Sequence, residues 1–306
     1  MQARTSALGA GRRHSVACRR DGTVVAAGAN AAGECLVELW KDVIAVAAGN
    51  VHTANNTGRS HTVGLRSDGT LLASGWNGDG QCDVAAWREI VAVAAGWRRT
   101  LGVLTDGTVL AAGRTSEGAC DVQRWREVVA VSCGDWHSVG VRSDGTALAA
   151  GNSRRGQCSV GGWRDLCDIA AGYLHTVGLQ ADGRVIATGD RTTGACDVEQ
   201  WEDVVALSAG SYHTVGVTEF GLVLAAGDNS FGQCEVSGWR DIVAVAGGST
   251  HTLGLRADGT VLSTGNNADG QCDVDTWSEV QASHPPFAPA SGDQPGPDRQ
   301  ARVANP

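Results

Sequence analysis

The chain has 306 residues, a formal net charge of −9, 42% hydrophobic residues and 19% charged residues. An acidic surface disfavours nucleic acids and anionic membranes, which attract Lys and Arg, so we expect neither as a partner. No apolar run approaches the roughly 18 residues that a membrane-spanning helix needs. Residues 1–13 include basic residues but no apolar core, and we expect no secretory signal there.

A repeat of 38 residues organises the chain and predicts its architecture. Each copy ends in Trp, and a Cys precedes that Trp by five residues. A residue present in every copy suits a structural role, because a catalytic site needs each of its groups once. The repeated tryptophans are Trp40, Trp87, Trp125, Trp163, Trp201, Trp239 and Trp277.

One copy, residues 128–163, shows the strands that we expect in each repeat. Short apolar runs separated by glycine suit strands, and the Asp144-Gly145 pair between two such runs is a strong hairpin signal. The four predicted strands of this copy are residues 128–133, 137–142, 146–150 and 157–160.

Seven such copies predict an all-β fold, a seven-bladed β-propeller with four-stranded antiparallel blades. A linear β-solenoid is the alternative, although its coils are usually shorter and parallel. The first copy starts with the predicted strand 14–18 and lacks a preceding strand, whereas residues 278–282 match the start of one. We therefore expect a C-terminal strand to complete the first blade and close the ring.

The predicted domain organisation has three parts: an N-terminal lead at 1–10, the propeller at 11–283 and a disordered tail at 284–306. All six prolines follow residue 284, and proline-rich, polar composition is typical of disorder. The ten cysteines recur at a uniform spacing instead of forming a disulfide framework. This pattern indicates reduced, buried thiols, and with the missing signal it predicts a cytoplasmic protein.

The repeated string resembles the regulator of chromosome condensation (RCC1) repeat family over roughly residues 11–283. One copy reads Ala-Gly-Tyr-Leu-His-Thr-Val-Gly-Leu at 171–179 and continues with Asp182-Gly183. Such copies go on to a Gly-x-x-x-x-Gly turn and a pair such as Gln157-Cys158. The resemblance implies a seven-bladed propeller of bacterial type. The chain is similar in repeat length to a secreted bacterial β-lactamase inhibitor protein with seven such blades.

The resemblance also implies a class of partner, because known family members include guanine nucleotide exchange factors for small GTPases. Two departures count against that role here. The exchange factor carries an inserted β-wedge, and we find no comparable insertion in this sequence. Its nucleosome-binding surface needs basic residues, whereas this chain is acidic.

The candidate site lies on one face of the predicted propeller, which we call the variable face. This face carries the turns between the first and second strands and the turns after the third strand. The opposite face, which we call the hairpin face, carries the Asp-Gly hairpins. Unrepeated aromatic residues gather in the variable-face turns, as a protein-binding surface requires. The resembling inhibitor binds through aromatic residues in these turns. The predicted partner-binding residues are Trp76, Trp97, Arg98, Asp135, Trp136, Tyr173, Leu174, Ser211, Tyr212 and Phe231.

Two further features bear on the site. A nine-residue insertion, 50–58, lengthens a turn of the second copy on the variable face. A histidine recurs in six copies, and Arg99 takes its place in the seventh. A ring of histidines could suggest a metal site, but equivalent positions in seven blades are spread apart. We expect these histidines to hydrogen-bond between neighbouring turns. The repeated histidines are His14, His61, His137, His175, His213 and His251.

These observations predict a non-enzymatic, monomeric scaffold that binds a protein partner through the variable face and uses no cofactor or metal. Two alternatives stay open. One is a guanine nucleotide exchange factor or another regulator of a small GTPase. The other is an enzyme with a site on the same face, although no nucleophile motif or phosphate-binding loop is present. The unrepeated charges there are Arg98, Glu117, Asp135, Arg154, Arg155 and Arg191.

Overall fold

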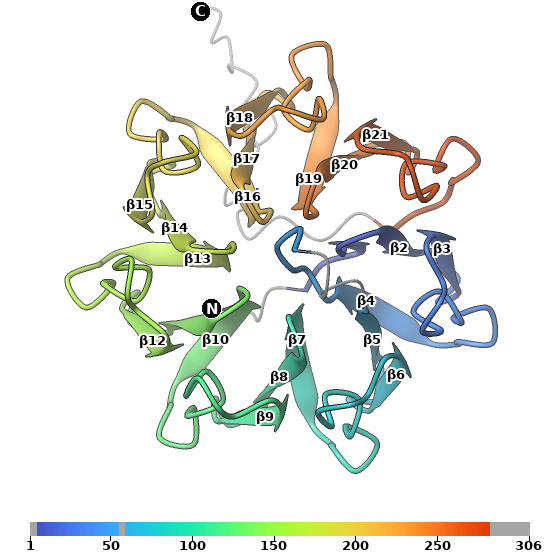
Figure 1. Ribbon diagram of the computed structural model, residues 1–306, viewed down its shortest axis with the longest axis horizontal. Helices are drawn as coiled ribbons and strands as arrows, with labels where there is room; N and C mark the ends of the chain where they lie inside the picture. Colours follow the sequence, from blue (N-terminus) through green and yellow to red (C-terminus); the bar gives the residue numbers. More distant parts are fainter. Residues whose placement is uncertain (1–4, 55–58, 282–306) are drawn as a thin grey trace, which may run out of the picture.

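The structure is a computed structural model that describes residues 5–54 and 59–281. These residues form seven antiparallel sheets of three strands, arranged in a ring with the first strand of each sheet innermost (Figure 1). We number the sheets as blades 1 to 7 in chain order. Within this part of the chain, no helix is long and apolar enough to cross a membrane. The predicted tail, 284–306, lies outside the described residues.

Each blade takes three consecutive strands. Blades 1 to 4 contain β1 (Leu8–Ala10), β2 (His14–Cys18), β3 (Val24–Gly28), β4 (Val43–Ala48), β5 (His61–Arg66), β6 (Leu71–Gly75), β7 (Ile90–Gly96), β8 (Arg99–Leu104), β9 (Val109–Gly113), β10 (Val128–Cys133), β11 (His137–Arg142) and β12 (Ala147–Gly151). Blades 5 to 7 contain β13 (Leu166–Ala171), β14 (His175–Gln180), β15 (Val185–Gly189), β16 (Val204–Ala209), β17 (His213–Thr218), β18 (Val223–Gly227), β19 (Ile242–Gly247), β20 (His251–Arg256) and β21 (Val261–Gly265).

The predicted hairpin between the second and third strands is present in blade 4. The Asp144 carboxylate accepts a hydrogen bond from the backbone N of Thr146 at 2.9 Å and another from its hydroxyl at 2.6 Å. This pairing of a side chain with the backbone two residues on is what makes Asp favourable in tight turns. The first three predicted strands of this copy are also confirmed, because β10, β11 and β12 match them within one residue at each boundary.

The predicted fourth strand is wrong. Residues 157–160 of blade 4 form consecutive turns whose backbone N–H groups bond locally. Gly156 N donates to Ser153 O at 2.9 Å, and Val160 N donates to Cys158 O at 2.9 Å. Amide groups used in this way are unavailable to a neighbouring strand, so the segment wraps around the outside of the blade without joining its sheet.

The inner strand of blade 1 also differs from expectation. Residues 8–10, which are predicted to belong to an N-terminal lead, instead form β1 and pair with β2. The predicted C-terminal strand contributes less: Val280 forms an isolated bridge with Arg19, and Gln281 N donates to Cys18 O at 2.9 Å. Both ends of the described chain thus bond to β2 or to the residue after it. A three-residue run, Leu-Gly-Ala, is too short to be recognised as a strand from sequence.

The repeated tryptophans pack between blades, which is a structural role of the kind expected for a residue present in every copy. Trp125, which follows blade 3, is buried in a cluster with Leu101, Val103 and Val128. A Cβ atom added to Gly140 of blade 4 would lie 3.0 Å from the Trp125 ring, so the glycine lets the ring pack closely against this strand. The large apolar area of each Trp contributes to the packing of neighbouring sheets.

The inner strands surround a central cavity of about 1160 Å³ that runs between the two faces. Small side chains such as Ala47, Ala94 and Ala170 line its length. Asn50 of the insertion contributes to the lining on the variable face, and Asp106 contributes on the hairpin face. Anything that covers the variable-face end of this cavity must therefore come from the turns or from the insertion.

Candidate functional site

The repeated histidines link neighbouring blades beneath the variable face. His137 Nε2 lies 2.8 Å from Thr176 Oγ1 of blade 5, and that hydroxyl donates to Gln157 O at 2.8 Å. Because the hydroxyl proton goes to the carbonyl, Nε2 must donate, and a neutral imidazole satisfies this contact. Burial is the main cause that lowers the pKa of His137 to about 3. The predicted hydrogen-bonding role is confirmed, although the partner lies on a strand and not in a turn.

The other five repeated histidines make the same contact with the next blade around the ring. The contact between His251 and Ser15 joins blade 7 to blade 1 at 2.9 Å. Among the described residues, no group of three His, Cys, Asp or Glu side chains is placed to hold a metal ion.

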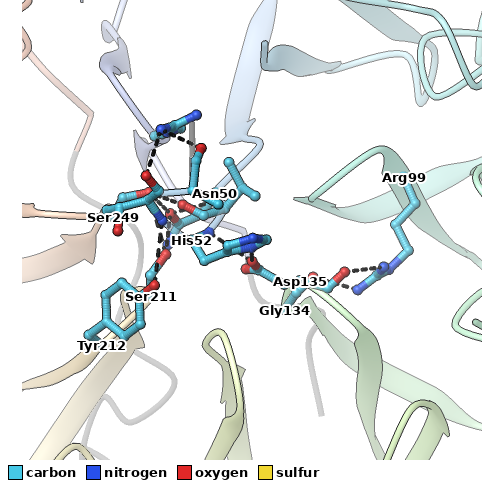
Figure 2. Close-up of polar contacts among 12 residues, drawn as sticks. Asn50, His52, Arg99, Gly134, Asp135, Ser211, Tyr212 and Ser249 are labelled. Atoms are coloured by element: carbon cyan, nitrogen blue, oxygen red, sulfur yellow. Dashed lines mark hydrogen bonds and ion pairs between the residues drawn. The ribbon is translucent and has the colours of Figure 1, made fainter. Parts of the chain in front are cut away.

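In blade 3, Arg99 takes the place of the histidine and links this blade to blade 4. Its side chain also reaches further than that of a histidine. Its Nε donates to Ser138 Oγ at 3.0 Å, and its Nη1 donates to Asp135 O at 3.0 Å. Nη2 donates to the carbonyls of Gly134 and His137. With only 1% of its surface exposed, Arg99 brings a positive charge beneath the first turn of blade 4. Figure 2 shows this guanidinium against the backbone of that turn.

Asp135 lies in the same turn, and its side chain is almost completely buried, at 2% exposure. Its Oδ2 accepts two hydrogen bonds from His52, from Nδ1 at 2.6 Å and from the backbone N at 2.7 Å. Burial raises the pKa of the Asp135 carboxyl, while the His52 bonds and the charge of Arg99 oppose that rise. A buried carboxylate therefore connects blade 4 to the insertion.

The described part of the insertion, residues 50–54, lies across the variable-face end of the central cavity (Figure 2). Asn50 Oδ1 accepts hydrogen bonds from Ser249 Oγ of blade 7 at 2.8 Å and from Ser211 Oγ of blade 6 at 3.2 Å. Asn50 Nδ2 donates to Gly247 O at 3.4 Å, and Val51 O is a second acceptor within reach of the single Ser249 hydroxyl proton. Val51 is 1% exposed, so the insertion is anchored firmly at its start.

The insertion continues toward blades 4 and 1. His52 binds Asp135, and Arg12 Nη2 of blade 1 donates to the carbonyls of Thr53 at 3.2 Å and Ala54 at 3.1 Å. Residues 50–54, which belong to blade 2, thus bond to blades 1, 4, 6 and 7. The rest of the insertion, 55–58, lies outside the described residues.

Aromatic rings and arginines from neighbouring turns form a continuous stack on the variable face, which we call the aromatic belt. The members of the aromatic belt are Trp76, Trp97, Arg98, Arg114, Trp136, Tyr173 and Tyr212, together with His52.

Edge-to-face and stacked contacts hold the belt together. The rings of Trp97 and Trp136 meet edge to face with centroids 4.6 Å apart, and those of Tyr173 and Tyr212 meet similarly at 5.5 Å. His52 bridges the two pairs, because its ring stacks on Tyr173 at 4.7 Å and on Trp136 at 5.9 Å. Such geometry suits aromatic rings, whose faces are negative and whose edges are positive.

Guanidinium groups extend the belt at one end. Arg98 lies over Trp76 at 4.8 Å and over Trp97 at 4.6 Å, and Arg114 lies 5.1 Å from Trp97. Each arginine also has a carboxylate partner: Arg98 with Asp79 at 3.4 Å, and Arg114 with Glu117 at 2.5 Å. Cation–π contacts of this kind fix the rings at a partly exposed surface.

The structure brings together most of the predicted site residues. Eight of the ten belong to the belt or bond to the insertion, namely Trp76, Trp97, Arg98, Asp135, Trp136, Tyr173, Ser211 and Tyr212. Leu174 lies half-buried beside Tyr173, and Phe231, which is 52% exposed, stands apart after β18.

Three of the predicted residues are buried and not available at the surface. Asp135, Ser211 and Trp97 are 2%, 1% and 8% exposed. The insertion contacts the first two directly, and His52 meets the Trp97 ring edge to face at 5.5 Å. The sequence places all three in turns, which usually face solvent, and the insertion covers them instead.

His52 was missed among the site residues, and Arg99 was noted only as a departure from the histidine pattern. His52 lies outside the repeat, within the only internal insertion, and both features pointed to it. Arg99 is a charge at a position buried in every other blade, so a compensating carboxylate nearby was to be expected.

Comparison with known proteins supports the fold. The crystal structure of the CRINKLY WD40 ectodomain of the Arabidopsis thaliana receptor kinase ACR4 has a TM-score of 0.65 and 18% identity, covering 87% of this chain and 98% of that chain. Prp20p from Saccharomyces cerevisiae, studied with its binding properties to Gsp1p and histones, has a TM-score of 0.60 and 17% identity, covering 79% and 76%. Yeast RCC1 (Prp20) with bound Kap60 has a TM-score of 0.59 and 18% identity, covering 79% and 74%. No curated protein sequence matches this chain.

The ring of seven sheets and these similarities define an all-β propeller. The repeats themselves match a known family model. The regulator of chromosome condensation (RCC1) repeat matches residues 56–81, 90–119, 128–157, 204–233 and 242–271. The chain is a propeller that contains RCC1 repeats.

Proposed function

We propose that this propeller is a non-enzymatic scaffold that binds a protein partner through the variable face. The observation that carries the proposal is the aromatic belt, a continuous surface built from residues that the repeat does not explain. Trp, Tyr and Arg dominate the energetic centres of protein interfaces, and Trp and Tyr bury a large area at a low cost in side-chain entropy.

The exposed part of the variable face is suited to contact a partner. Trp136, Tyr173 and Tyr212 remain partly accessible in the belt, and Phe231 adds an exposed ring in blade 6. The ring of His52 in the insertion stacks on Tyr173 and Trp136, so these belt rings are already ordered before a partner binds. A preorganised surface binds more tightly for that reason. The protein-binding properties of Prp20p are consistent with this use of the fold.

The experiment compares a triple variant, Trp136→Ala, Tyr212→Ala, Phe231→Ala, with the wild type. Both proteins are immobilised, and captured proteins are quantified by mass spectrometry. A matched control is Phe220→Ala, because Phe220 is 68% exposed in the β17–β18 hairpin on the hairpin face. We expect the triple variant to recover at least about tenfold less of a specific partner, since hot-spot residues often contribute about 2 kcal/mol or more each. Retention of every partner by the folded triple variant would show that the variable face is not the binding surface.

The partner class separates the remaining alternatives. A small GTPase among the lost proteins would favour the regulator alternative, and a nucleotide-release assay with that GTPase then tests exchange activity.

The proposal includes a monomeric chain in the cytoplasm. All ten cysteines are free, and burial raises the pKa of Cys133 to about 11, so that it stays a thiol. Free, protonated thiols suit a reducing compartment. Light scattering of the purified protein measures the mass in solution, and fractionation of the source cells measures the location.

A further inference from the structure

His52 occupies a cage formed by Trp97, Trp136, Tyr173 and Asp135, four residues from three different blades. Its imidazole stacks on Tyr173 and Trp136 with interplanar angles of 25° and 29°, and it meets the edge of Trp97 at 79°. Asp135 Oδ2 lies 2.6 Å from its Nδ1. The repeat explains none of these four cage residues, because the equivalent turn positions vary from blade to blade.

The cage has the chemistry of a site for a flat, basic group. Aromatic faces attract cations, and a buried carboxylate accepts hydrogen bonds from N–H donors. The outer surface of the same rings already holds two guanidinium groups, since Arg114 lies 5.1 Å from Trp97 and 5.9 Å from Trp136, and Arg98 lies 4.6 Å from Trp97. Those two arginines have their own carboxylate partners, Asp79 and Glu117. Arg99 donates to the backbone carbonyl of Asp135, and the Asp135 carboxylate accepts its hydrogen bonds from His52.

The anchor of the insertion is separate from the cage. Asn50 and Val51 are held by blades 6 and 7 through Ser211, Ser249 and Gly247. His52 is the next residue, and Thr53 and Ala54 beyond it are exposed. The imidazole is therefore the one group of residues 50–54 that enters the cage, and its contacts can be removed while Asn50 and Val51 keep theirs.

We propose that the cage recognises a basic side chain of the protein partner, preferably arginine, and that His52 holds its place in the free chain. The inference rests on the proposed function and adds the chemistry of the partner. The guanidinium group combines a flat π-face with several N–H donors, so it can stack between Tyr173 and Trp136 while it donates to Asp135. A lysine has no such face and fits the geometry less well.

The test uses N-acetylarginine amide as the probe, with N-acetylcitrulline amide as a control of nearly the same shape without the charge. Binding to the full chain is followed by the NMR signals of the tryptophan indole N–H groups. In His52→Ala, we expect saturable shifts of the Trp97 and Trp136 signals with the arginine probe. We expect the dissociation constant to be at least about tenfold lower than in the wild type. The double variant His52→Ala, Asp135→Asn should lose this binding, and the citrulline probe should have little effect.

Equal responses to the two probes in His52→Ala, or no saturable shift, would overturn the inference. If His52→Ala does not fold, His52→Gln and the wild type replace it. The arginine probe must then displace the imidazole and shift the His52 ring signals in the wild type, and a failure to do so also overturns the inference. Partner capture by the triple variant, which also removes the cage residue Trp136, is a second readout that tests the proposed function. Loss of capture by this variant, without saturable probe binding to His52→Ala, rejects the cage alone, whereas unchanged capture rejects the proposed function.

Discussion

Gly134 shows how a single position restricts the repeat. This glycine precedes the variable turn of blade 4 and packs against the imidazole of its own blade. A Cβ atom placed on it would lie 2.7 Å from His137 Cε1 and would also meet the backbone carbonyl of Gly172. Neither the buried ring nor the neighbouring backbone can move away without breaking the link between blades.

The substitution Gly134→Ala is therefore expected to destabilise the protein by about 1–3 kcal/mol, the usual cost of overpacking a closed site. Gly161→Ala is the matched control, because no atom lies within 4 Å of the Cβ position there. The control should change the stability by less than about 0.5 kcal/mol. Urea unfolding monitored by tryptophan fluorescence measures both, and equal effects would mean that the packing around Gly134 is not restrictive.

The buried histidines make stability depend on pH. Burial lowers the pKa of His14, His175 and His213 to about 4, and that of His61 and His251 to about 3, from an ordinary value of 6.5. The unfolded chain therefore takes up protons below about pH 6.5, while the folded chain does so only near pH 3–4. The stability from these groups is complete above about pH 6.5 and is lost as the pH falls toward about 4.

We expect the free energy of unfolding to decrease between about pH 6.5 and 4, by at most about 1.4 kcal/mol per pH unit for each histidine. Unfolding in urea at several pH values measures the slope. The variant His137→Gln should be less stable near neutral pH but should show a smaller slope. A stability that stays constant from about pH 7 to 4.5 would contradict the assignment of neutral, buried imidazoles.

At the scale of elements, the insertion is the part that changes the surface most. Asn50 Oδ1 accepts three hydrogen bonds, from Ser211, from Ser249 and from the backbone N of Val51 at 2.8 Å. Replacing Asn50 by Ala leaves these donors without this acceptor in a buried region. The expected loss of stability is about 1–3 kcal/mol.

Thr53→Ala is the matched control for Asn50→Ala, because Thr53 is exposed and its contact with Arg12 uses the backbone carbonyl. Thermal unfolding followed by circular dichroism compares the two variants. Similar melting temperatures for Asn50→Ala and the wild type would show that the insertion is not anchored at this point.

Sequence reasoning was most successful where a local pattern decides the structure. The Asp-Gly hairpins and the strands around them follow from residues close in the chain. The segment at 157–160 was misjudged because its composition suits a strand, while its amides bond within successive turns. The burial of Asp135 was also missed, since it depends on His52, which lies 83 positions away in the sequence.

At the scale of the whole molecule, the two ends of the described chain meet in one blade. Val280 is fully buried in a cluster with Leu8, Ala10 and Trp277, between blades 7 and 1. Its bridge to Arg19 lies just beyond the pairing of β1 with β2. The contact between the ends therefore contributes to the stability of the entire ring.

Val280→Ala should lower the free energy of unfolding by about 2 kcal/mol, since it removes buried methyl groups from a closed cluster. Val205→Ala is the control, because Val205 is 38% exposed on the inner strand β16. Chemical denaturation measures the free energy of unfolding of both variants and of the wild type. If the two substitutions have the same small effect, residues near the C-terminus do not contribute to the closure of the ring.

The central claim is that the partner contacts the variable face, and β18 offers a direct test of it. Phe231 and Phe220 are both exposed but lie beyond opposite ends of this strand, the first on the variable face and the second on the hairpin face. A photo-crosslinking amino acid, p-benzoylphenylalanine, is placed at either position, and crosslinked partner is quantified after irradiation. We predict a crosslink to the captured partner from position 231 and none from position 220. A crosslink from position 220 alone would contradict the claim.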